Sequence, residues 1–583
     1  MVTRRAVRLF KVNVVIVGLS LLCAVAAHSA AAAEYRPEAW NLQAREKFAE
    51  QRYGVFIVWG LYAYYAQGEC YMWQRKIDRD AYERIVDGFY PSKFNAREWV
   101  RIVRRSGAKY ITVTARHCDG FALWPSKVDY GYNIAATPFK RDVIGELAEA
   151  CKAEGIQLNL YYSLMDWHRR DYPLGRSCKW LKAYAKDQKP NYASYKRYMM
   201  GQITELLDNY HPGNIWFDCE WDQYDRDRGG TFDWGFDEIF DLIHSRHVLV
   251  ANNNHRAPRP KEDIQLFERD LPGVGTMFSK KQPLLEDRPS EQCDVIQYNV
   301  WGYQIGQKKF RPPEECIALI ARAASKGSNL LLNIGPDASG EIPVKAVEVF
   351  EGIGKWFEKN GDSIYGTKAG GVSLGVKVVS TRKDDTLYIH FIDPAVKEFT
   401  FLLDGKKTTV KCNRPSDDVS DIVVRFPLGG KDPVQYVEPG SQQMWRVVGQ
   451  TCKNPGNAKA AIDDNRDSLW HSHPEPMAKN DPLPPPQSFT VDCGAVREMR
   501  GFTYTPRLVS CSVGVVDKCE FWVSLDGKDW TKAAEGSFPD VLESRKTREV
   551  KFVKPVKARY FRFVATHVLP VNDRLAVAEV DVL

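Results

Sequence analysis

Two patterns of hydrophobic and polar positions alternate between residues 34 and 366. Amphipathic stretches with apolar residues at helical spacing begin at Asn95 and cover 141–154, 195–210 and 314–326. Between such stretches lie short apolar runs, typical of buried parallel strands, at residues 54–59, 110–114, 157–161, 214–218, 248–251 and 329–334. Repeated strand–helix units over this length predict a (β/α) barrel.

Local signals mark where several of these helices begin and end. Asn95 and Glu98 have the spacing of a capping box at a helix start. Gly155, Gly213 and Gly327 each follow a predicted helix, and glycine is the usual residue just after a helix end.

The pattern changes after residue 366, and the chain is predicted to be a multidomain α/β plus all-β protein. Residues 367–448 contain short β-rich runs such as Thr386–Phe391 and Ile422–Phe426 and no long helical pattern, which predicts a small antiparallel β-sandwich. Residues 449–460 are a polar linker. Residues 461–583 are again all-β, with strands expected near 521–524, 549–553 and 560–565.

Residues 1–33 have the features of a signal peptide. Basic residues precede an apolar stretch from Val14 to Ala27, and Ala31-Ala32-Ala33 offers a cleavage site. A retained membrane anchor is the alternative, but the stretch is short for a span. We therefore expect an exported protein, secreted or periplasmic, without a retained membrane span.

Composition narrows the class of function. The net charge of +7 over 583 residues, without a dense basic block, argues against nucleic-acid binding. The 16 Trp and 27 Tyr suit carbohydrate recognition, although they equally suit large aromatic cores. The 13 Cys are too few for a disulfide-built scaffold and match no zinc spacing. Cys70, Cys118 and Cys219 fall at predicted strand ends.

Polar residues follow the strands at the end where barrels of this kind keep their chemistry. Asp218, which ends the apolar run Asn214–Phe217, is the clearest of these, although an Asp there could also cap a helix. No phosphate-binding loop, metal-binding helix motif or serine nucleophile elbow is present. Carboxylates from different loops are what glycoside hydrolysis requires. The polar residues that follow the predicted strands or lie on later loops of the first domain are Glu69, His117, Asp119, Tyr161, Tyr162, Asp166, Asp218, Asn252–Asn254, Glu268 and Glu291.

Six short motifs follow one another along the first domain: Phe56–Gly60, Gly68–Tyr71, Arg116–Phe121, Ile215–Asp218, Phe267–Gly273 and Asn329–Pro336. In this order they resemble glycoside hydrolase family 29, the retaining α-L-fucosidases, and the resemblance covers roughly residues 36–448.

The resemblance implies an exo-glycosidase that releases terminal fucose from oligosaccharides, polysaccharides or glycoconjugates by double displacement. Asp218 matches the nucleophile, and Glu268 is the expected acid/base, with Glu291 as the alternative. No cofactor is expected for catalysis. The positions that would contact the sugar are Glu69, His117, Tyr161 and Trp301.

Four positions depart from the family pattern: Val58 and Cys118 stand where histidines are usual, Cys70 replaces an aromatic residue, and Asn254 replaces an arginine. A site that loses hydrogen-bond donors changes its discrimination between substrates strongly. Two alternatives therefore accompany fucosidase activity: a related retaining glycosidase with altered sugar specificity, or a catalytically weak glycan-binding protein.

Residues 461–583 resemble a discoidin-type (F5/8 type C) domain, similar to carbohydrate-binding module family 32. The matching runs include Ala461–Asn465, Leu469–Ser472, Phe521–Gly527 and Ala558–Arg562. The resemblance implies a structural calcium site, for which Asp463, Asp467 and Glu579 are candidate ligands. The alternative to a calcium site is a turn whose carboxylates are solvated. The alternative to glycan binding is a purely structural or adhesive role for the domain.

Overall fold

The computed structural model describes residues 35–129, 131–173, 189–225, 230–254, 256–269, 271–273, 282–413, 422–437, 442–451, 458–463, 470–471, 485–506, 514–542, 544, 546–569 and 575–583. The expected signal peptide, 1–33, lies outside these residues.

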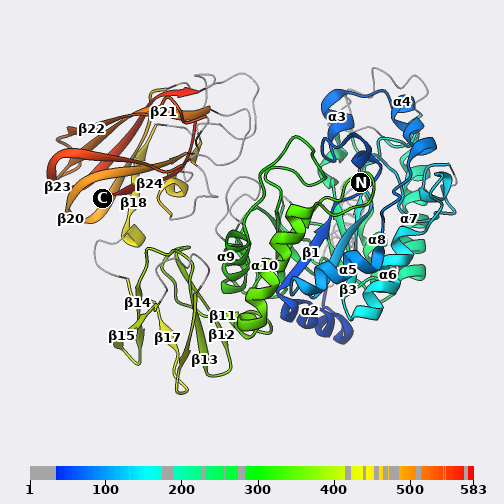
Figure 1. Cartoon of the computed structure of the whole chain (residues 1–583), viewed down its shortest axis with the longest axis horizontal. Coiled ribbons are helices and arrows are strands. Elements are labelled where there is room, and N and C mark those ends of the chain that lie inside the picture. The colour runs from blue at the N-terminus through cyan, green and yellow to red at the C-terminus, as the bar shows by residue number, and fades with distance from the viewer. Residues whose placement is uncertain are drawn as a thin grey trace, which may run out of the picture.

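The first domain is built on eight parallel strands, as expected for a (β/α) barrel (Figure 1). The strands are hydrogen-bonded in the order β7-β4-β3-β2-β1-β10-β9-β8. Their bounds are β1 Tyr53–Ile57, β2 Tyr110–Arg116, β3 Gln157–Ser163, β4 Asn214–Asp218, β7 Leu249–Ala251, β8 Gln265–Glu268, β9 Ser290–Val295 and β10 Asn329–Ile334.

Helices cover the outside of this sheet in Figure 1. Their side chains contribute to one large apolar core together with the strands. Four of the described α-helices begin at a residue whose side chain accepts a backbone N–H: Asp78 for the short helix α4 Arg79–Glu83, and Asn95, Asp142 and Asn191 for three longer ones. The principal helices are α2 Ala39–Gln51, α5 Ala96–Arg105, α6 Val143–Glu154, α7 Tyr192–Tyr210, α8 Phe236–His244, α9 Pro313–Ser325 and α10 Val344–Asn360.

Gly213 does not end α7, contrary to expectation. His211 is the residue in the left-handed conformation after α7, with φ of 47°. Gly213 instead allows close packing, because a Cβ there would lie 2.0 Å from Nε2 of Gln157. The expectation about Gly155 is confirmed, since it caps α6 with φ of 67°.

The apolar pattern missed strands β8 and β9. Strand β9, Ser-Glu-Gln-Cys-Asp-Val, is wholly buried although most of its residues are polar. These side chains find partners inside the protein. Glu291 accepts hydrogen bonds from Tyr110 and Trp216, and Asp294 pairs with Arg311.

Side chains close the barrel between β7 and β8, which share no strand ladder in the sheet order. Asp263, just before β8, accepts the backbone N–H of Val250 at 2.7 Å through its carboxylate and donates its own N–H to the carbonyl of Val250. After β7, Asn253 donates to the carbonyl of Ile264 and accepts from the N–H of Leu266, both at 2.7 Å. We call these contacts the seam.

The Asp263 carboxylate is fully buried and also accepts hydrogen bonds from Asn41 and Arg45 and contacts His244. Burial would raise the pKa of Asp263. Hydrogen bonding to His244 and the positive charge of Arg45 outweigh burial and hold that pKa below its usual value. The carboxylate therefore stays charged inside the seam.

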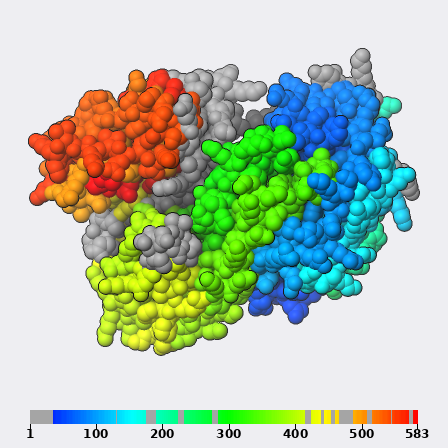
Figure 2. Space-filling view, in the orientation of Figure 1, coloured from blue at the N-terminus to red at the C-terminus, as the bar shows by residue number. Residues whose placement is uncertain are grey.

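Two β domains follow the barrel and lie beside it (Figures 1 and 2). The first packs two antiparallel sheets, ordered β11-β12-β13-β16 and β15-β14-β17, around its own core. Its strands are β11 Lys368–Ala369, β12 Val378–Lys383, β13 Thr386–Phe391, β14 Glu398–Leu403, β15 Lys406–Lys411, β16 Ile422–Pro427 and β17 Pro433–Val434.

The C-terminal domain is a seven-stranded sheet that curves around a separate core. Its first strand spans the expected boundary at 448, because residues 446–450 pair with β20 rather than with the middle sandwich. The strands of the C-terminal domain are β18 Arg446–Gln450, β19 Trp470–His471, β20 Gln487–Pro506, β21 Gly514–Ser524, β22 Thr531–Ser537, β23 Arg548–Leu569 and β24 Leu575–Val582.

None of the helices in the described part of the chain combines the length and the apolar character that a membrane span needs.

We predict that Asp263→Ala destabilises the barrel by about 3–5 kcal/mol, because it leaves the buried Arg45 guanidinium without its charge partner. Glu341→Ala is the matched control. It breaks the solvent-exposed ion pair with Lys93, which screening by water makes weak. Calorimetric unfolding of both variants measures the difference, and equal losses of stability would contradict a special role for the seam.

Candidate active site

A cavity of about 250 Å³ opens at the carboxyl ends of the barrel strands. Residues from strand ends on every side of the barrel contribute to it, which is where this fold places its chemistry. Its lining consists of Phe56, Val58, Glu69, Cys70, Trp73, Thr114, His117, Cys118, Tyr161, Met165, Trp167, Trp216, Asp218, Cys219, Trp221, Asn254, Glu268, Cys293 and Trp301.

Asp218 is the last residue of β4 and reaches the cavity with its carboxylate held on both sides. Oδ2 accepts a hydrogen bond from the hydroxyl of Tyr161 at 3.1 Å. Oδ1 accepts the backbone N–H of Cys219 at 2.7 Å. Cys219 itself has φ of 68°, a strained value for a residue with a side chain. The turn after β4 thus fixes the orientation of this carboxylate.

Glu268 ends β8 and also lines the cavity. Its Oε2 accepts a hydrogen bond from Nδ2 of Asn254 at 3.0 Å. Asn254 directly follows Asn253, whose amide joins β7 to β8. The seam therefore lies between the two carboxylates, because Asp218 belongs to β4, the neighbour of β7, and Glu268 belongs to β8.

Three rings stand side by side along the ends of β2, β3 and β4. The rings of His117 and Tyr161 are stacked with centroids 5.6 Å apart, and those of Tyr161 and Trp216 are stacked at 5.5 Å. Burial and the nearby Asp218 charge raise the pKa of Tyr161 well above its usual value, so its hydroxyl remains a hydrogen-bond donor.

His117 has unmet hydrogen-bonding capacity. Its Nδ1 is buried and has no partner among the residues the structure describes. Burial alone would lower the pKa of His117, but the neighbouring Cys118, Glu69 and Asp119 raise it to about 9. A cationic, partly unpaired imidazole at the cavity wall is suited to hydrogen-bond a hydroxyl of a bound sugar.

The remaining expected sugar contacts lie on loops at the cavity. Glu69 accepts the backbone N–H of Gly302 at 2.8 Å, which ties the loop after β1 to the loop carrying Trp301. The guanidinium of Arg269 lies 5.0 Å from the ring centroid of Trp301 and supports its orientation. The structure thus brings together Asp218, Glu268, Glu69, His117, Tyr161 and Trp301 in one cavity.

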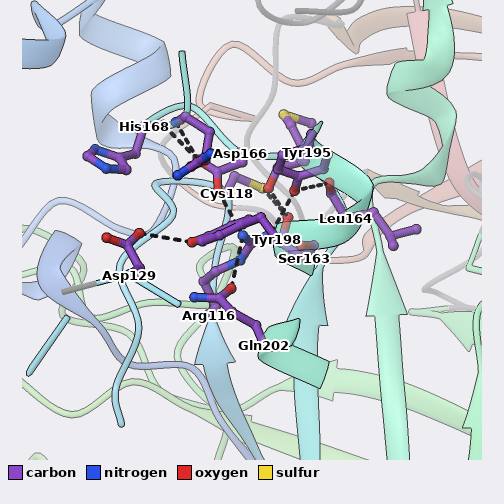
Figure 3. A network of polar contacts seen from close by, with 12 residues as sticks. Arg116, Cys118, Asp129, Ser163, Leu164, Asp166, His168, Tyr195, Tyr198 and Gln202 are labelled. Atoms are coloured by element: carbon purple, nitrogen blue, oxygen red, sulfur yellow. Dashed lines mark hydrogen bonds and ion pairs between the residues drawn. The ribbon is translucent and has the colours of Figure 1, made fainter. Parts of the chain in front are cut away.

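A buried ion pair supports the strand ends beneath this cavity (Figure 3). Arg116, the last residue of β2, donates to Asp166 at 2.7 Å, and neither side chain is exposed. The same guanidinium donates to the carbonyl of Ser163 at 2.5 Å and to the hydroxyl of Tyr195 at 2.9 Å. These contacts connect the ends of β2 and β3 with α7.

Glu291, the alternative acid/base, does not line the cavity. It is 1% exposed and lies near the start of β9, where it accepts hydrogen bonds from Tyr110 at 2.6 Å and from Trp216 at 3.1 Å. Burial raises the pKa of Glu291 to about 7. Asp119, Tyr162 and Asp166 do not line the cavity either, and each bonds to another buried group.

Sequence reasoning did not assign a role to Trp73, Trp221 or Cys293, which also belong to the lining. Trp73 and Trp221 are 45% and 42% exposed, which places them at the mouth of the cavity. Trp221 follows Asp218 by three positions, a proximity that could have indicated a role. Cys293 lies in the polar strand β9, which the apolar pattern overlooked.

Among the described residues, no group of three or more His, Cys, Asp or Glu side chains is arranged to hold a metal ion. Of the candidate calcium ligands, Asp467 lies outside the described residues, and Glu579 accepts a hydrogen bond from Gln442 at 2.9 Å. The calcium site stays a prediction.

Comparison with known proteins decides the family. The family model described as Alpha-L-fucosidase matches residues 22–362, and the F5/8 type C domain model matches residues 447–580. The chain belongs to the alpha-L-fucosidase family. It is therefore a glycoside hydrolase with a C-terminal F5/8 type C domain, as the motifs predicted.

Individual relatives agree with this assignment. The tissue alpha-L-fucosidase of Rattus norvegicus is 30% identical over 408 residues, 64% of this chain and 83% of the relative. Alpha-L-fucosidase isoenzyme 1 from Paenibacillus thiaminolyticus superposes with a TM-score of 0.58 at 28% identity, covering 67% of this chain and 99% of that one.

A third similar protein has been trapped during its reaction. It is an alpha-L-fucosidase from Bacteroides thetaiotaomicron, solved as a covalent intermediate with 2-fluoro-fucosyl fluoride. Its TM-score is 0.53 at 26% identity, covering 67% of this chain and 96% of that one.

We predict that Glu291 makes the stability of this family member pH-dependent. Its folded pKa of about 7 exceeds the ordinary value of 4.5, so the folded state holds a proton that the unfolded state releases. This stabilisation is complete below pH 4.5 and is lost as the pH rises through 7, a change of up to about 3 kcal/mol.

Thermal unfolding of the wild type and Glu291→Gln across this pH range tests the prediction. The variant has no ionisable group at this position, so its melting temperature should fall less between pH 4.5 and 7 than that of the wild type. Parallel pH profiles would show that Glu291 does not titrate in this range.

Proposed function

We propose that this protein is an exported, retaining α-L-fucosidase that removes terminal fucose from glycans. The observation that carries the proposal is the position of Asp218 and Glu268 in one cavity, on strand ends separated by the seam. Two carboxylates that flank a glycosidic bond are the requirement for hydrolysis with a covalent intermediate. The trapped intermediate of the Bacteroides relative supports the same course here.

In the first step, Asp218 attacks the anomeric carbon and Glu268 gives its proton to the leaving oxygen. Tyr161 and the N–H of Cys219 hold the attacking carboxylate in place, and Asn254 holds Glu268. In the second step, Glu268 takes a proton from water, which then attacks the same carbon and releases Asp218. Apart from the water of the second step, the proposed reaction calls on no metal or organic cofactor.

The cavity supports attack at a chain end rather than within a polymer. Phe56 and Trp216 are 4% and 2% exposed and contact each other at the cavity wall, whereas Trp73 and Trp221 are open to solvent. A single sugar therefore fits the enclosed part, and the leaving group extends past the exposed indoles, which offer flat surfaces for a second sugar ring.

The proposals of export and of glycan binding rest on residues 1–33 and on the C-terminal domain, respectively. Residues 1–33 have the sequence of a signal peptide, and the protein is proposed to be secreted or periplasmic. The F5/8 type C domain is proposed to bind glycans, which would raise the effective concentration of the barrel near polymer-bound substrate.

Altered sugar specificity is the second candidate. Val58 and Cys118 line the cavity, are 3% and 4% exposed, and offer little hydrogen bonding to a sugar hydroxyl. Rates of 4-nitrophenol release from the 4-nitrophenyl α-L-fucoside, α-galactoside and β-galactoside distinguish the two candidate functions. Preference for the fucoside supports the first, and preference for another sugar supports the second.

We predict that 2-fluoro-fucosyl fluoride adds one fluorofucosyl group to the wild type, attached to Asp218. Asp218→Ala should show no label and should lose at least about 10³-fold in kcat, because the covalent step has no nucleophile. Mass spectrometry of the intact protein and of its peptides gives the answer, and a label on another residue would refute the assignment.

Glu268→Gln should lower kcat/KM by about 10²–10⁴-fold for fucosides with poor leaving groups. The loss should be much smaller for a dinitrophenyl fucoside, whose leaving oxygen needs little protonation. Kinetics on both substrates, with Glu291→Gln as the matched carboxylate control, measure this difference. An equal loss on both substrates would exclude Glu268 as the acid.

A further inference from the structure

Two thiols meet at the wall of the cavity. Cys118 follows β2 and Cys219 follows β4, 101 residues later, and their Sγ atoms are 3.3 Å apart. Both side chains are nearly buried, at 4% and 5% exposed, yet both line the cavity. Ser163, at the end of the intervening β3, donates its hydroxyl to Sγ of Cys118 at 3.3 Å. Figure 3 shows Cys118 beside the buried network around Arg116.

The surroundings divide the roles of these thiols. The hydrogen bond from Cys219 holds the pKa of Cys118 well below its usual value, His117 and Ser163 act in the same direction, and burial opposes them. The pKa of Cys219 is raised by the contact with Cys118, by burial and by the charge of Asp218. These directions, together with the hydrogen bond from Ser163, favour Cys118 as the thiolate of the pair and Cys219 as the thiol beside it.

Other buried cysteines differ from this pair. Burial raises the pKa of Cys151 and of Cys519 to about 12, so both stay protonated at neutral pH. A neutral thiol that is buried without a thiolate neighbour and without access to the cavity is chemically inert. Neither residue lines the cavity.

We propose that Cys118 and Cys219 form an oxidation-sensitive site at which a small peroxide entering the cavity produces a disulfide and lowers turnover. The Cys118 thiolate attacks one oxygen of the peroxide, the O–O bond breaks, and hydroxide leaves and takes a proton from solvent to become water. The sulfur of Cys219 then attacks the sulfenic acid, the S–O bond breaks, and a second water leaves with the thiol proton. The two thiols lose two electrons, and the peroxide gains them.

The cysteine pair is coupled to the proposed nucleophile, Asp218, through one hydrogen bond from a backbone N–H. A disulfide has a sulfur–sulfur distance of about 2.05 Å, so the two sulfurs approach by more than 1 Å on oxidation. The N–H of Cys219 orients Asp218 at 2.7 Å, and Cys219 already has a strained φ of 68°. Displacing Cys219 therefore displaces the carboxylate. A misplacement of about 1 Å can cost about 10²-fold in rate.

The proposed export strengthens the case, because thiols outside the cytoplasm lack a reducing pool. The activity part of the test rests on the proposed function. The chemical part does not, because bond formation is read from peptide masses whatever sugar the enzyme hydrolyses.

The experiment treats the full-length protein with hydrogen peroxide, alkylates the remaining thiols under denaturing conditions and maps the peptides. We expect a crosslinked pair of peptides containing Cys118 and Cys219, and at least a tenfold fall in kcat that dithiothreitol reverses. Three results would each overturn the proposal. They are a disulfide between other cysteines, a stable sulfenic acid that forms no disulfide, and a Cys118–Cys219 disulfide that leaves kcat unchanged.

Variants confirm which thiols respond. In Cys219→Ser, the ratio of kcat before and after peroxide should fall to about 1, whatever the absolute activity of the variant. Cys151→Ser, on α6 and outside the cavity, is the matched control and should keep the wild-type ratio. An unchanged ratio in Cys219→Ser overturns the proposal. Because peptide mapping uses the wild type, it tests the proposal even where a variant folds poorly.

Discussion

The seam between β7 and β8 is the constraint on which the active site depends. A parallel barrel has to satisfy the backbone groups of every strand, and here the buried carboxylate of Asp263 and the amide of Asn253 replace a strand ladder. The same seam separates the two proposed catalytic carboxylates, because Asp218 lies on its β4 side and Glu268 on β8. Closure of the fold and the relative placement of these two carboxylates thus rest on the same few polar groups.

Polar groups continue this role throughout the barrel interior. Arg116 and Asp166 join the ends of β2 and β3 to α7, and Glu291 connects β9 with Tyr110 and Trp216. A buried charge is costly unless it is paired or protonated, and these groups meet that condition in different ways. Arg116 has its carboxylate, whereas Glu291 has only neutral donors and a raised pKa. The carboxylates below the cavity therefore support the fold, and those at its wall remain available for chemistry.

The cavity combines features of a sugar site with an unusual amount of sulfur. The stacked rings of His117, Tyr161 and Trp216 provide the flat, partly polar surface that sugars require. Cys70, Cys118, Cys219 and Cys293 occupy other parts of the lining. Because thiols are weak hydrogen-bond partners, the carboxylates, His117 and Asn254 are the stronger hydrogen-bonding groups of the lining, and the thiols offer a chemistry that the proposed glycosidase reaction does not use.

The sequence by itself determined the three-domain plan, the strands that are apolar, the family and Asp218 as the leading candidate, because these follow from local periodicity and from motifs carried on short segments. It did not reveal β8 and β9, whose polar residues are satisfied only by distant partners such as Tyr110 and Arg311. It ranked Glu268 ahead of Glu291 as the acid/base, but it could not show which of them lines the cavity. Both are glutamates near strands, and only the tertiary structure decides that one faces the cavity while the other is buried beneath Trp216. The contact between Cys118 and Cys219 has the same origin, since 101 residues of chain separate two atoms that the barrel places 3.3 Å apart.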